Sequence, residues 1–331
     1  MKAKEELNCT VPVPAWAETE WHGKCHLVFR FQPRSEFSCF TGLPFLPRFM
    51  FTRLKHRSSL STVSPGSLCA WTAVSDLGLK RQNNEDSWGV FLLSDGRPQA
   101  VRTARVELPG AGLLLILSDG MGGTQAGEEA SRFCVEQVAM HLATTRGWGK
   151  LSKAMRKALV ATHAALLKRG GERQGWLGMG ATLSVLWLLP NGRMALGHVG
   201  DSRIYRRRRG KMEQLTEDHS VGAGMVRRGE LTEEAATRLK FRSLLEQAMG
   251  GDGAPIFPQI SEAEWKPGDG FVLCSDGLYG PLKDRLEVAL AAALEDGSEH
   301  AAADLIASAN AAGGPDNITV ILARFMPEAT T

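Results

Sequence analysis

The stretch GLLLILSDGMGG, residues 112–123, decides how this chain folds. Its first half is a short, wholly apolar run followed by turn residues, a pattern typical of a buried strand. Asp119 would then stand at the end of the strand, where a side chain can leave the core and reach a ligand. The glycines behind it allow a sharp turn and the close approach of another group. Taken alone, an ordinary strand ending in an Asp-Gly turn explains the stretch equally well.

The same design returns elsewhere in the chain. An apolar run again ends in Ser-Asp-Gly at 271–277, and a variant is found at 197–202. Acids also stand in front of a strand at 313–317 and side by side at 83–86. Acids at strand ends among small residues are typical of oxygen ligands that bind a hard cation.

Composition limits the classes of protein to consider. The 331 residues, 43% apolar and 23% charged, are typical of a soluble globular protein with one large domain or two small ones. A net charge of +3 is too small to indicate a nucleic-acid partner. No apolar run approaches the roughly 18 residues of a membrane span, and the polar start argues against a signal peptide. The six cysteines have no zinc or disulfide spacing, so we expect them to be reduced, in the cytoplasm.

Residues 1–70 differ from the rest of the chain. Prolines and aromatics are mixed without a period, nine Lys/Arg outnumber five Asp/Glu, and 58–67 resembles a linker. We expect a poorly ordered extension, which an early start codon could have added, and the alternative is a tethering or regulatory arm. A regular pattern begins at Trp71, which predicts a domain over 71–326 and a tail over 327–331.

The regular part alternates between strand and helix patterns. Asn191-Gly192 predicts a hairpin, Thr232 predicts a helix N-cap, and Asp284 with Glu287 predicts a capping box. We expect a turn and one return strand over 94–110. Hairpins between strands, with helices in pairs, favour antiparallel sheets faced by helices over a βαβ array. Strands are predicted near 71–74, 87–93, 112–117, 182–189, 193–199, 204–207, 212–215, 271–275 and 318–325, and helices from 128, at 150–168, before 294 and at 299–312.

Two features allow more than one interpretation. The four arginines 206–209 could bind phosphate or nucleic acid, or they could flank an exposed turn, which a neutral core favours. His219 could act as an acid or base, although a structural histidine is the simpler interpretation.

The acids predict a particular chemistry if they converge. Several neighbouring carboxylates repel one another, and their pKa values rise unless a cation neutralises them. An all-oxygen ligand set favours Mg²⁺ or Mn²⁺ over Zn²⁺, and two such ions can turn a bridging water into a nucleophile near neutral pH. Arg81 offers a planar fork that matches phosphate. The sequence contains no GxSxG elbow, cysteine loop or P-loop for a covalent route. The acids concerned are Glu85, Asp86, Asp119, Asp276 and Asp316.

Seven motifs in order resemble those of the PP2C (PPM) family of metal-dependent Ser/Thr protein phosphatases. The resemblance covers about Trp71 to Phe325 and is similar to the bacterial branch, which has Met after Asp-Gly. The motifs are DLGLKRQNNED (76–86), DGMGGTQAGE (119–128), GMGAT (178–182), GDSR (200–203), DHS (218–220), SDGL (275–278) and DNITV (316–320).

The resemblance implies an α+β fold, a four-layer α-β-β-α sandwich of two antiparallel sheets flanked by helix pairs, with the metal site in a cleft at one end. It implies Arg81 as the phosphate ligand and Glu85 as an outer-sphere ligand. Asp201 would join Asp276 in binding a third, weaker ion. The ligands of the two main Mn²⁺ or Mg²⁺ ions would be Asp86, Asp119, the Gly120 carbonyl, Asp276 and Asp316, so that Arg81 and these four acids form the catalytic group.

The chain also departs from the family. Met121 stands where eukaryotic members have a histidine proposed as general acid, so the leaving group must take its proton from another source. Residues 218–248 match a flap that varies with substrate, but 237–240 lack the turn that relatives often have. The segment 1–70 has no counterpart in the family.

The expected function is hydrolysis of phosphoserine and phosphothreonine by a metal-activated water, without a covalent intermediate. The partner would be a phosphorylated protein, the product of a bacterial Ser/Thr kinase. We expect a monomer with no nucleic-acid partner and no membrane insertion. The alternatives are a catalytically inactive phosphoprotein-binding module on the same fold and a small-molecule phosphoesterase.

Overall fold

A computed structural model describes residues 68–94, 96–108, 110–121, 125–145 and 150–326, and the backbone of β1 (Glu18–Thr19) and β2 (Phe29–Arg30). The chain divides into two compact units, residues 1–62 and 63–331, and β1 pairs with β2 in the first. Most of the predicted extension, the tail 327–331 and the glycines of 122–123 lie outside the described residues. The division at residue 70 therefore stays a prediction, and β3 begins slightly earlier, at Leu68.

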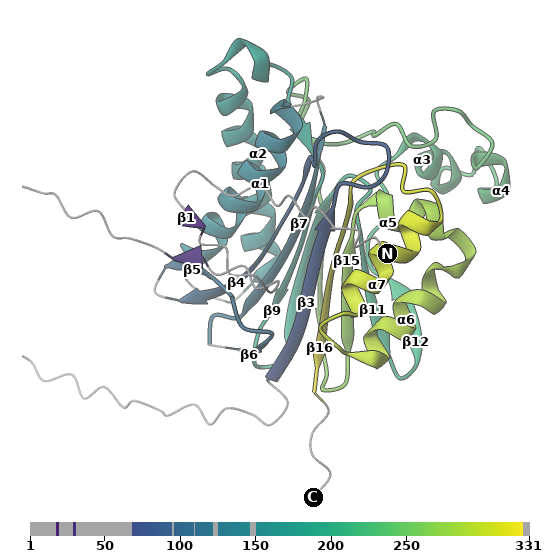
Figure 1. Ribbon diagram of the computed structural model, residues 1–331. Coiled ribbons are helices and arrows are strands. Elements are labelled where there is room, and N and C mark those ends of the chain that lie inside the picture. Colours follow the sequence, from purple (N-terminus) through teal and green to yellow (C-terminus); the bar gives the residue numbers. More distant parts are fainter. Residues whose placement is uncertain are drawn as a thin grey trace, which may run out of the picture. The chain divides into compact units, whose positions relative to one another are not determined.

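Two antiparallel sheets form the centre of the second unit (Figure 1). The eight-stranded sheet contains β4 (Asp86–Ser94), β5 (Arg97–Ala100), β7 (Leu113–Met121), β8 (Gly180–Ala181), β9 (Leu183–Leu188), β10 (Arg193–Val199), β13 (Met249–Gly250) and β14 (Gln259–Glu264). The six-stranded sheet has the order β12 (Lys211–Gln214), β11 (Arg203–Arg208), β15 (Gly270–Cys274), β16 (Ile318–Phe325), β3 (Leu68–Asp76) and β6 (Arg105–Glu107).

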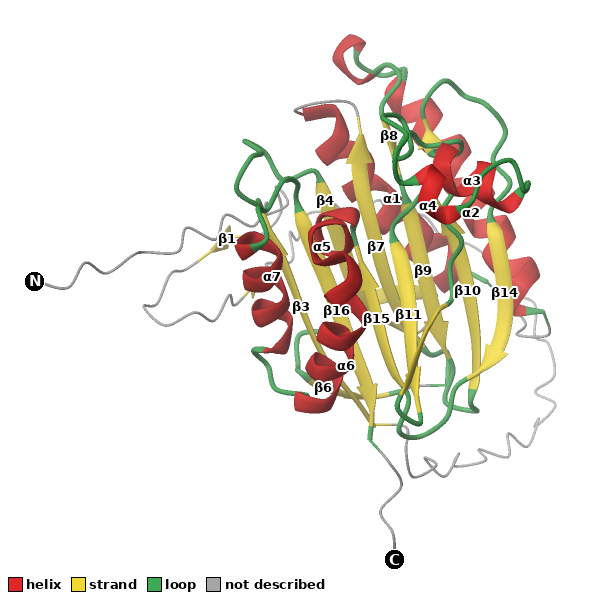
Figure 2. Ribbon diagram, turned by 90° about the vertical axis from the view of Figure 1, so that its right-hand side faces the viewer, coloured by secondary structure: helices red, strands yellow, loops and turns green. Residues whose placement is uncertain are grey.

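Helices cover the outer face of each sheet, which confirms the four layers (Figure 2). The eight-stranded sheet is covered by α1 (Gln125–Ala143) and α2 (Leu151–Gly170), the six-stranded one by α5 (Asp276–Leu282), α6 (Leu286–Asp296) and α7 (Ala301–Ala311). The shorter helical elements are η1 (Gln174–Trp176), α3 (Val221–Arg227), α4 (Glu233–Ala236) and η2 (Lys283–Arg285). Within the described part of the chain, no helix is both long and apolar enough to cross a bilayer.

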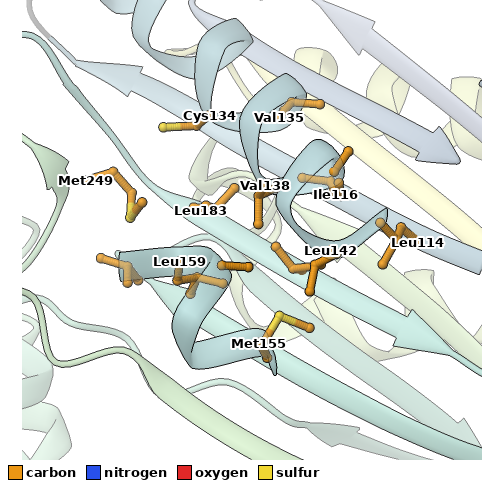
Figure 3. Packing of buried hydrophobic residues seen from close by; sticks show 14 of the residues in the cluster. Leu114, Ile116, Cys134, Val135, Val138, Leu142, Met155, Leu159, Leu183 and Met249 are labelled. Atoms are coloured by element: carbon orange, nitrogen blue, oxygen red, sulfur yellow. The ribbon is translucent and has the colours of Figure 1, made fainter. Parts of the chain in front are cut away.

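Strand β7 is apolar from Leu113 to Leu117 because both of its faces are buried there. Leu114 and Ile116 pack against α1 and α2 in the outer core, where Figure 3 shows them beside Val138 and Leu142. The alternate residues, Leu113, Leu115 and Leu117, pack between the two sheets. A strand with one solvated face would alternate apolar and polar residues, so the unbroken run follows from the central place of β7.

Most of the local predictions are confirmed. The Asn191-Gly192 turn joins β9 to β10, and the Thr232 hydroxyl caps α4 by accepting a hydrogen bond from the Ala235 amide at 3.2 Å. The single return strand over 94–110 is wrong, because β5 and β6 divide that segment between the two sheets.

The predicted capping box at Asp284 is also wrong. The 3-10 turn of η2 occupies Lys283–Arg285, and α6 begins only at Leu286 with no side-chain cap. The tight connection between α5 and α6 uses the residues that would otherwise have formed the first helical turn.

The arginine run flanks the β11–β12 hairpin, as the simpler interpretation predicts. Arg206 pairs with Glu213, Arg207 with Glu295, and Arg208 with the buried Asp269. These three guanidinium groups therefore already have carboxylate partners within the fold.

Both faces of β7 should be equally intolerant of truncation. We expect Leu115→Ala and Ile116→Ala each to lower the free energy of unfolding by about 3 kcal/mol, because each leaves a cavity in a different core. Leu177→Ala, at a side chain that is 80% exposed, is the control and should change it by less than about 0.5 kcal/mol. Urea denaturation measures all three, and a cost below about 1 kcal/mol for either core variant would contradict the double burial.

Candidate active site

Two of the predicted acids come from neighbouring strands of the eight-stranded sheet. Asp86 begins β4 and is directly opposite Asp119 of β7 in the strand register. The Gly120 amide donates to the Glu85 carbonyl at 3.0 Å, and Glu85 itself is buried. The pairing of β4 with β7 therefore brings together two carboxylates that are 33 residues apart in the chain.

Gly120 allows the start of α1 to lie against this strand end. A Cβ atom on Gly120 would be 2.1 Å from the Gly127 carbonyl oxygen, and one on Gly127 would be 2.5 Å from Oε2 of Glu85. Any side chain at either position would push Glu85 or the helix away from the acids. The glycines at 120 and 127 are thus explained by close packing around the site.

The six-stranded sheet supplies two more acids at the ends of adjacent strands. Asp276 follows β15 and begins α5, while Asp316 stands just before β16, which pairs with β15. Asn317 ties this corner to the other sheet: its Oδ1 accepts from the Glu85 amide at 2.8 Å. Its Nδ2 donates to the carbonyls of Leu77 and Asn83 at 3.0 and 2.9 Å. One buried amide therefore holds both sheets and the loop that carries Arg81.

Arg81 lies at the outer side of these acids. Its Nη2 atom is 2.6 Å from Oδ2 of Asp316, and its side chain is 48% exposed. The hydrogen bond to Asp316 raises the pKa of Arg81 further, with smaller contributions from the charges of Glu85 and Asp119. A permanently charged guanidinium next to the acids, yet open to solvent, can receive a phosphate group.

Asp201 lies where the chain passes from β10 in one sheet to β11 in the other. Burial and the charge of Asp276 raise its pKa to about 8. The Tyr279 hydroxyl donates to the Asp201 backbone carbonyl at 3.1 Å, and the Arg203 guanidinium lies over the Tyr279 ring at 3.7 Å. Arg203 in turn forms a two-point ion pair with Asp218, where the predicted flap begins.

Without a cation, the charges of these acids repel one another, and burial disfavours their ionised forms. Burial, with the charges of Asp276 and Asp316, raises the pKa of Asp86 to about 7, while the Thr319 and Ser275 hydroxyls lower it. Burial and the Asp316 charge raise the pKa of Asp276 to about 6. The pKa of Asp119 is raised well above its ordinary value by burial and four neighbouring aspartates. Each acid therefore acts on the others across the two sheets.

Two carboxylate oxygens in this group, Oδ1 of Asp86 and Oδ1 of Asp276, are buried without a hydrogen-bond partner. A bare buried carboxylate oxygen is costly unless a cation or donor meets it. Among the described residues, no three acids, histidines or cysteines form a compact ligand cage. The aspartates instead lie within electrostatic range of one another, and this all-oxygen donor set fits hard divalent cations.

His219 has a structural role, which was the simpler interpretation. It is buried, its Nδ1 accepts from the Gly200 amide at 3.3 Å, and its amide donates to the Gly200 carbonyl at 2.7 Å. Burial lowers its pKa, so the ring is neutral near pH 7. It holds the loop before Asp201 against the start of the flap.

The excursion after His219 contains α3 and α4 and returns to its starting point. Val221 donates to the Leu244 carbonyl at 2.8 Å, and Ser220 forms a bridge with Leu245. Residues 218–248, which match the flap of the family, thus contain two short helices, and residues 237–240 lie beyond the end of α4.

Sequence reasoning missed the residues that support the acids. Ser275, Thr319, Tyr279 and Arg203 were part of quoted motifs or near them, but no role was predicted for their side chains. The repeated Ser-Asp-Gly was the signal that could have indicated Ser275. The partners of Thr319 and Tyr279 are distant in sequence, so no local pattern indicates them.

Known proteins resemble this chain over the same region. The family model of protein phosphatase 2C matches residues 89–309. Serine/threonine protein phosphatase PstP of Mycobacterium tuberculosis is 36% identical over 253 residues, which are 76% of this chain and 44% of PstP. The chain thus spans less than half of that relative. Serine/threonine phosphatase stp of Listeria welshimeri is 30% identical over 250 residues, 75% of this chain and 92% of that protein.

A solved structure supports the same relationship. The catalytic domain of PstP, solved in complex with two manganese ions, has a TM-score of 0.63 and 32% identity, and the match covers 78% of this chain and 99% of that one. The fold, the motif order and these matches agree. The chain belongs to the protein phosphatase 2C family.

Proposed function

We propose that this chain is a metal-dependent protein serine/threonine phosphatase that hydrolyses phosphoserine and phosphothreonine without a covalent intermediate. The observation that carries the proposal is a group of five buried or half-buried aspartates, two of which have a carboxylate oxygen with no hydrogen-bond partner. Relatives named as serine/threonine phosphatases support it. The substrate would be a phosphorylated protein made by a Ser/Thr kinase.

The residues have distinct proposed roles. Two Mn²⁺ or Mg²⁺ ions would be held by Asp86, Asp119, the Gly120 carbonyl, Asp276 and Asp316, with Glu85 in the outer sphere. Asp201 and Asp276 would hold a third, weaker ion. The manganese reported for the catalytic domain of PstP supports this choice of metal. When bound, such ions supply an acidified water for attack on phosphorus.

The chain itself orients the substrate and the ligands. Arg81 would bind phosphoryl oxygens with its exposed fork, after exchanging the Asp316 carboxylate for the phosphate. Asn317 connects the loop that carries Arg81 to Glu85 through hydrogen bonds to both. Met121, at the end of β7, has a thioether and no proton to donate, so the leaving alkoxide must be protonated by another group.

The alternatives are less well supported. An inactive module would be expected to lack ligands, and all five predicted acids are present. A small-molecule phosphoesterase would use the same site, so only substrates can separate it from a protein phosphatase. The cysteines of the described residues, Cys69, Cys134 and Cys274, are free and buried, in keeping with a reducing compartment such as the cytoplasm.

The purified protein should hydrolyse p-nitrophenyl phosphate and a phosphothreonine peptide when Mn²⁺ is added. We expect Asp276→Asn to lower kcat by about 100-fold or more, because a ligand charge at the reacting phosphate is lost. The exposed Asp304→Asn, on α7, is the matched control and should be unchanged. Absence of turnover with metal, or full activity of Asp276→Asn, would refute the proposal.

Protein substrates separate the two phosphoesterase hypotheses. A kinase-phosphorylated protein extract and a panel of small phosphate monoesters are compared at equal phosphate concentration. We expect kcat/KM to be at least about tenfold higher for phosphoproteins, because an extended substrate makes binding contacts that a small ester cannot make. The reverse order would favour the small-molecule function.

Stability should depend on pH in the direction set by the raised pKa values. The folded protein keeps protons on Asp276 and Asp86 up to about pH 6 and 7, whereas the unfolded chain loses them near pH 3.8. Since the folded state binds more protons in this window, the stability of the metal-free protein falls as pH rises from about 4 to 8.

Thermal unfolding in EDTA checks this directly. We expect Tm to be about 5 °C or more lower at pH 8 than at pH 5, and Mn²⁺ to raise Tm much more at pH 8. Asp119→Asn, which removes one of the repelling charges, should raise the Tm of the metal-free protein at pH 8. A metal-free protein whose Tm rises steadily from pH 5 to pH 8 would contradict the electrostatic picture.

A further inference from the structure

The tripeptide Ser-Asp-Gly occurs twice at the site, at 118–120 and 275–277, and its two serines do different things. Both are fully buried. The Ser118 hydroxyl donates to the Thr182 backbone carbonyl at 2.6 Å, within its own sheet. The Ser275 hydroxyl donates to Oδ2 of Asp86 at 2.7 Å, across the interface to the other sheet. The repeat is therefore a repeat of sequence and not of role.

The direction of the Ser275 hydrogen bond is determined by its surroundings. The Thr319 amide donates to the Ser275 oxygen at 3.0 Å, which occupies one of the lone pairs of that oxygen. The hydroxyl then donates its hydrogen bond to Asp86, because the alternative acceptor, the Asn317 carbonyl, is 3.5 Å away. A hydroxyl held in this way stabilises the ionised carboxylate.

A second hydroxyl reaches the same carboxylate. The Thr319 hydroxyl acts on Asp86 as a donor that lowers its pKa, and its Oγ1 lies 2.7 Å from the hydroxyl of Ser75. The Asn84 side-chain amide donates to Ser75 at 2.8 Å. Since Ser75 already accepts from Asn84, its own proton is available to Thr319, which leaves the Thr319 proton for Asp86. The relay runs from Asn84 through Ser75 and Thr319 to the acid.

Both donors come from the six-stranded sheet, while Asp86 belongs to the eight-stranded one. Oδ2 of Asp86 accepts a hydrogen bond from the Ser275 hydroxyl, and Oδ1 of the same carboxylate is buried with no protein partner. The carboxylate is thus anchored on one oxygen from the opposite sheet and bare on the other.

We propose that Ser275 and Thr319 are positioning residues, which hold the Asp86 carboxylate in one rotamer so that its Oδ1 can bind a divalent cation. They thereby set the affinity of the site for metal. This inference rests on the proposed function, because it gives Asp86 the role of a metal ligand. Hydrogen-bonding partners of metal ligands commonly change metal affinity by about 10- to 100-fold.

The matched experiment compares Ser275→Ala with Ser118→Ala. Each removes one fully buried hydroxyl in front of an Asp-Gly pair, so the loss of packing is similar, but only the first removes a donor to a carboxylate. Mn²⁺ binding is measured by titration calorimetry on the full chain. We expect the Kd to rise about tenfold in Ser275→Ala and to stay within about twofold of wild type in Ser118→Ala.

A second pair of variants, at Thr319, keeps the experiment informative if Ser275→Ala does not fold. Thr319→Val keeps the shape and the amide donor but removes the hydroxyl, whereas Thr319→Ser keeps the hydroxyl. We expect weaker Mn²⁺ binding in the valine variant and near wild-type binding in the serine variant. At saturating Mn²⁺, turnover of p-nitrophenyl phosphate should return toward the wild-type kcat, since the groups act on metal affinity.

The outcomes separate the two proposals. If the wild-type protein binds no Mn²⁺ and has no turnover, the proposed function is refuted. This inference is then refuted as well, because it depends on that function. If wild type binds and turns over, but Ser275→Ala and Thr319→Val bind Mn²⁺ as tightly as their controls, the positioning role is overturned and the phosphatase remains.

Discussion

Mutual repulsion among buried carboxylates is the constraint on which this structure depends. Folding buries Asp86 and Asp201, partly buries Asp119 and Asp276, and places their charges within range of one another. Burial and repulsion favour the protonated form of each carboxyl group, and this preference raises its pKa. The result is a concentrated negative site. Binding of a divalent cation there would offset the unfavourable free energy of the carboxylate repulsion.

The packing of two sheets against each other brings these acids together. No single sheet supplies the site: β4 and β7 provide two acids, and the ends of β15 and β16 provide the others. The distances between the acids therefore depend on how the two sheets stack on each other. Asn317 and Ser275 connect the sheets through directional hydrogen bonds at the site. Apolar layers supply stability, and these polar contacts supply the alignment that the chemistry needs.

Local sequence patterns were sound where one element decides the outcome. The apolar run of β7, the turn at Asn191-Gly192 and the cap at Thr232 depend on neighbours in the chain. They failed where a tertiary connection competes with local preference. Asp284 has the spacing of a capping box, but the closure between α5 and α6 takes up that turn. Likewise the segment 94–110 is divided between two sheets, which no periodicity in it records.

By itself the sequence determined which residues carry charge at strand ends, which runs are buried, and the motif order that marks the family. It could not decide that the acids meet, because β4, β7, β15 and β16 lie far apart along the chain and their separation is set by sheet pairing. Only the tertiary structure decided which oxygen of Asp86 is anchored and which is bare. The reason is physical: a hydrogen bond across 189 residues depends on the relative position of two sheets, and no local pattern encodes it.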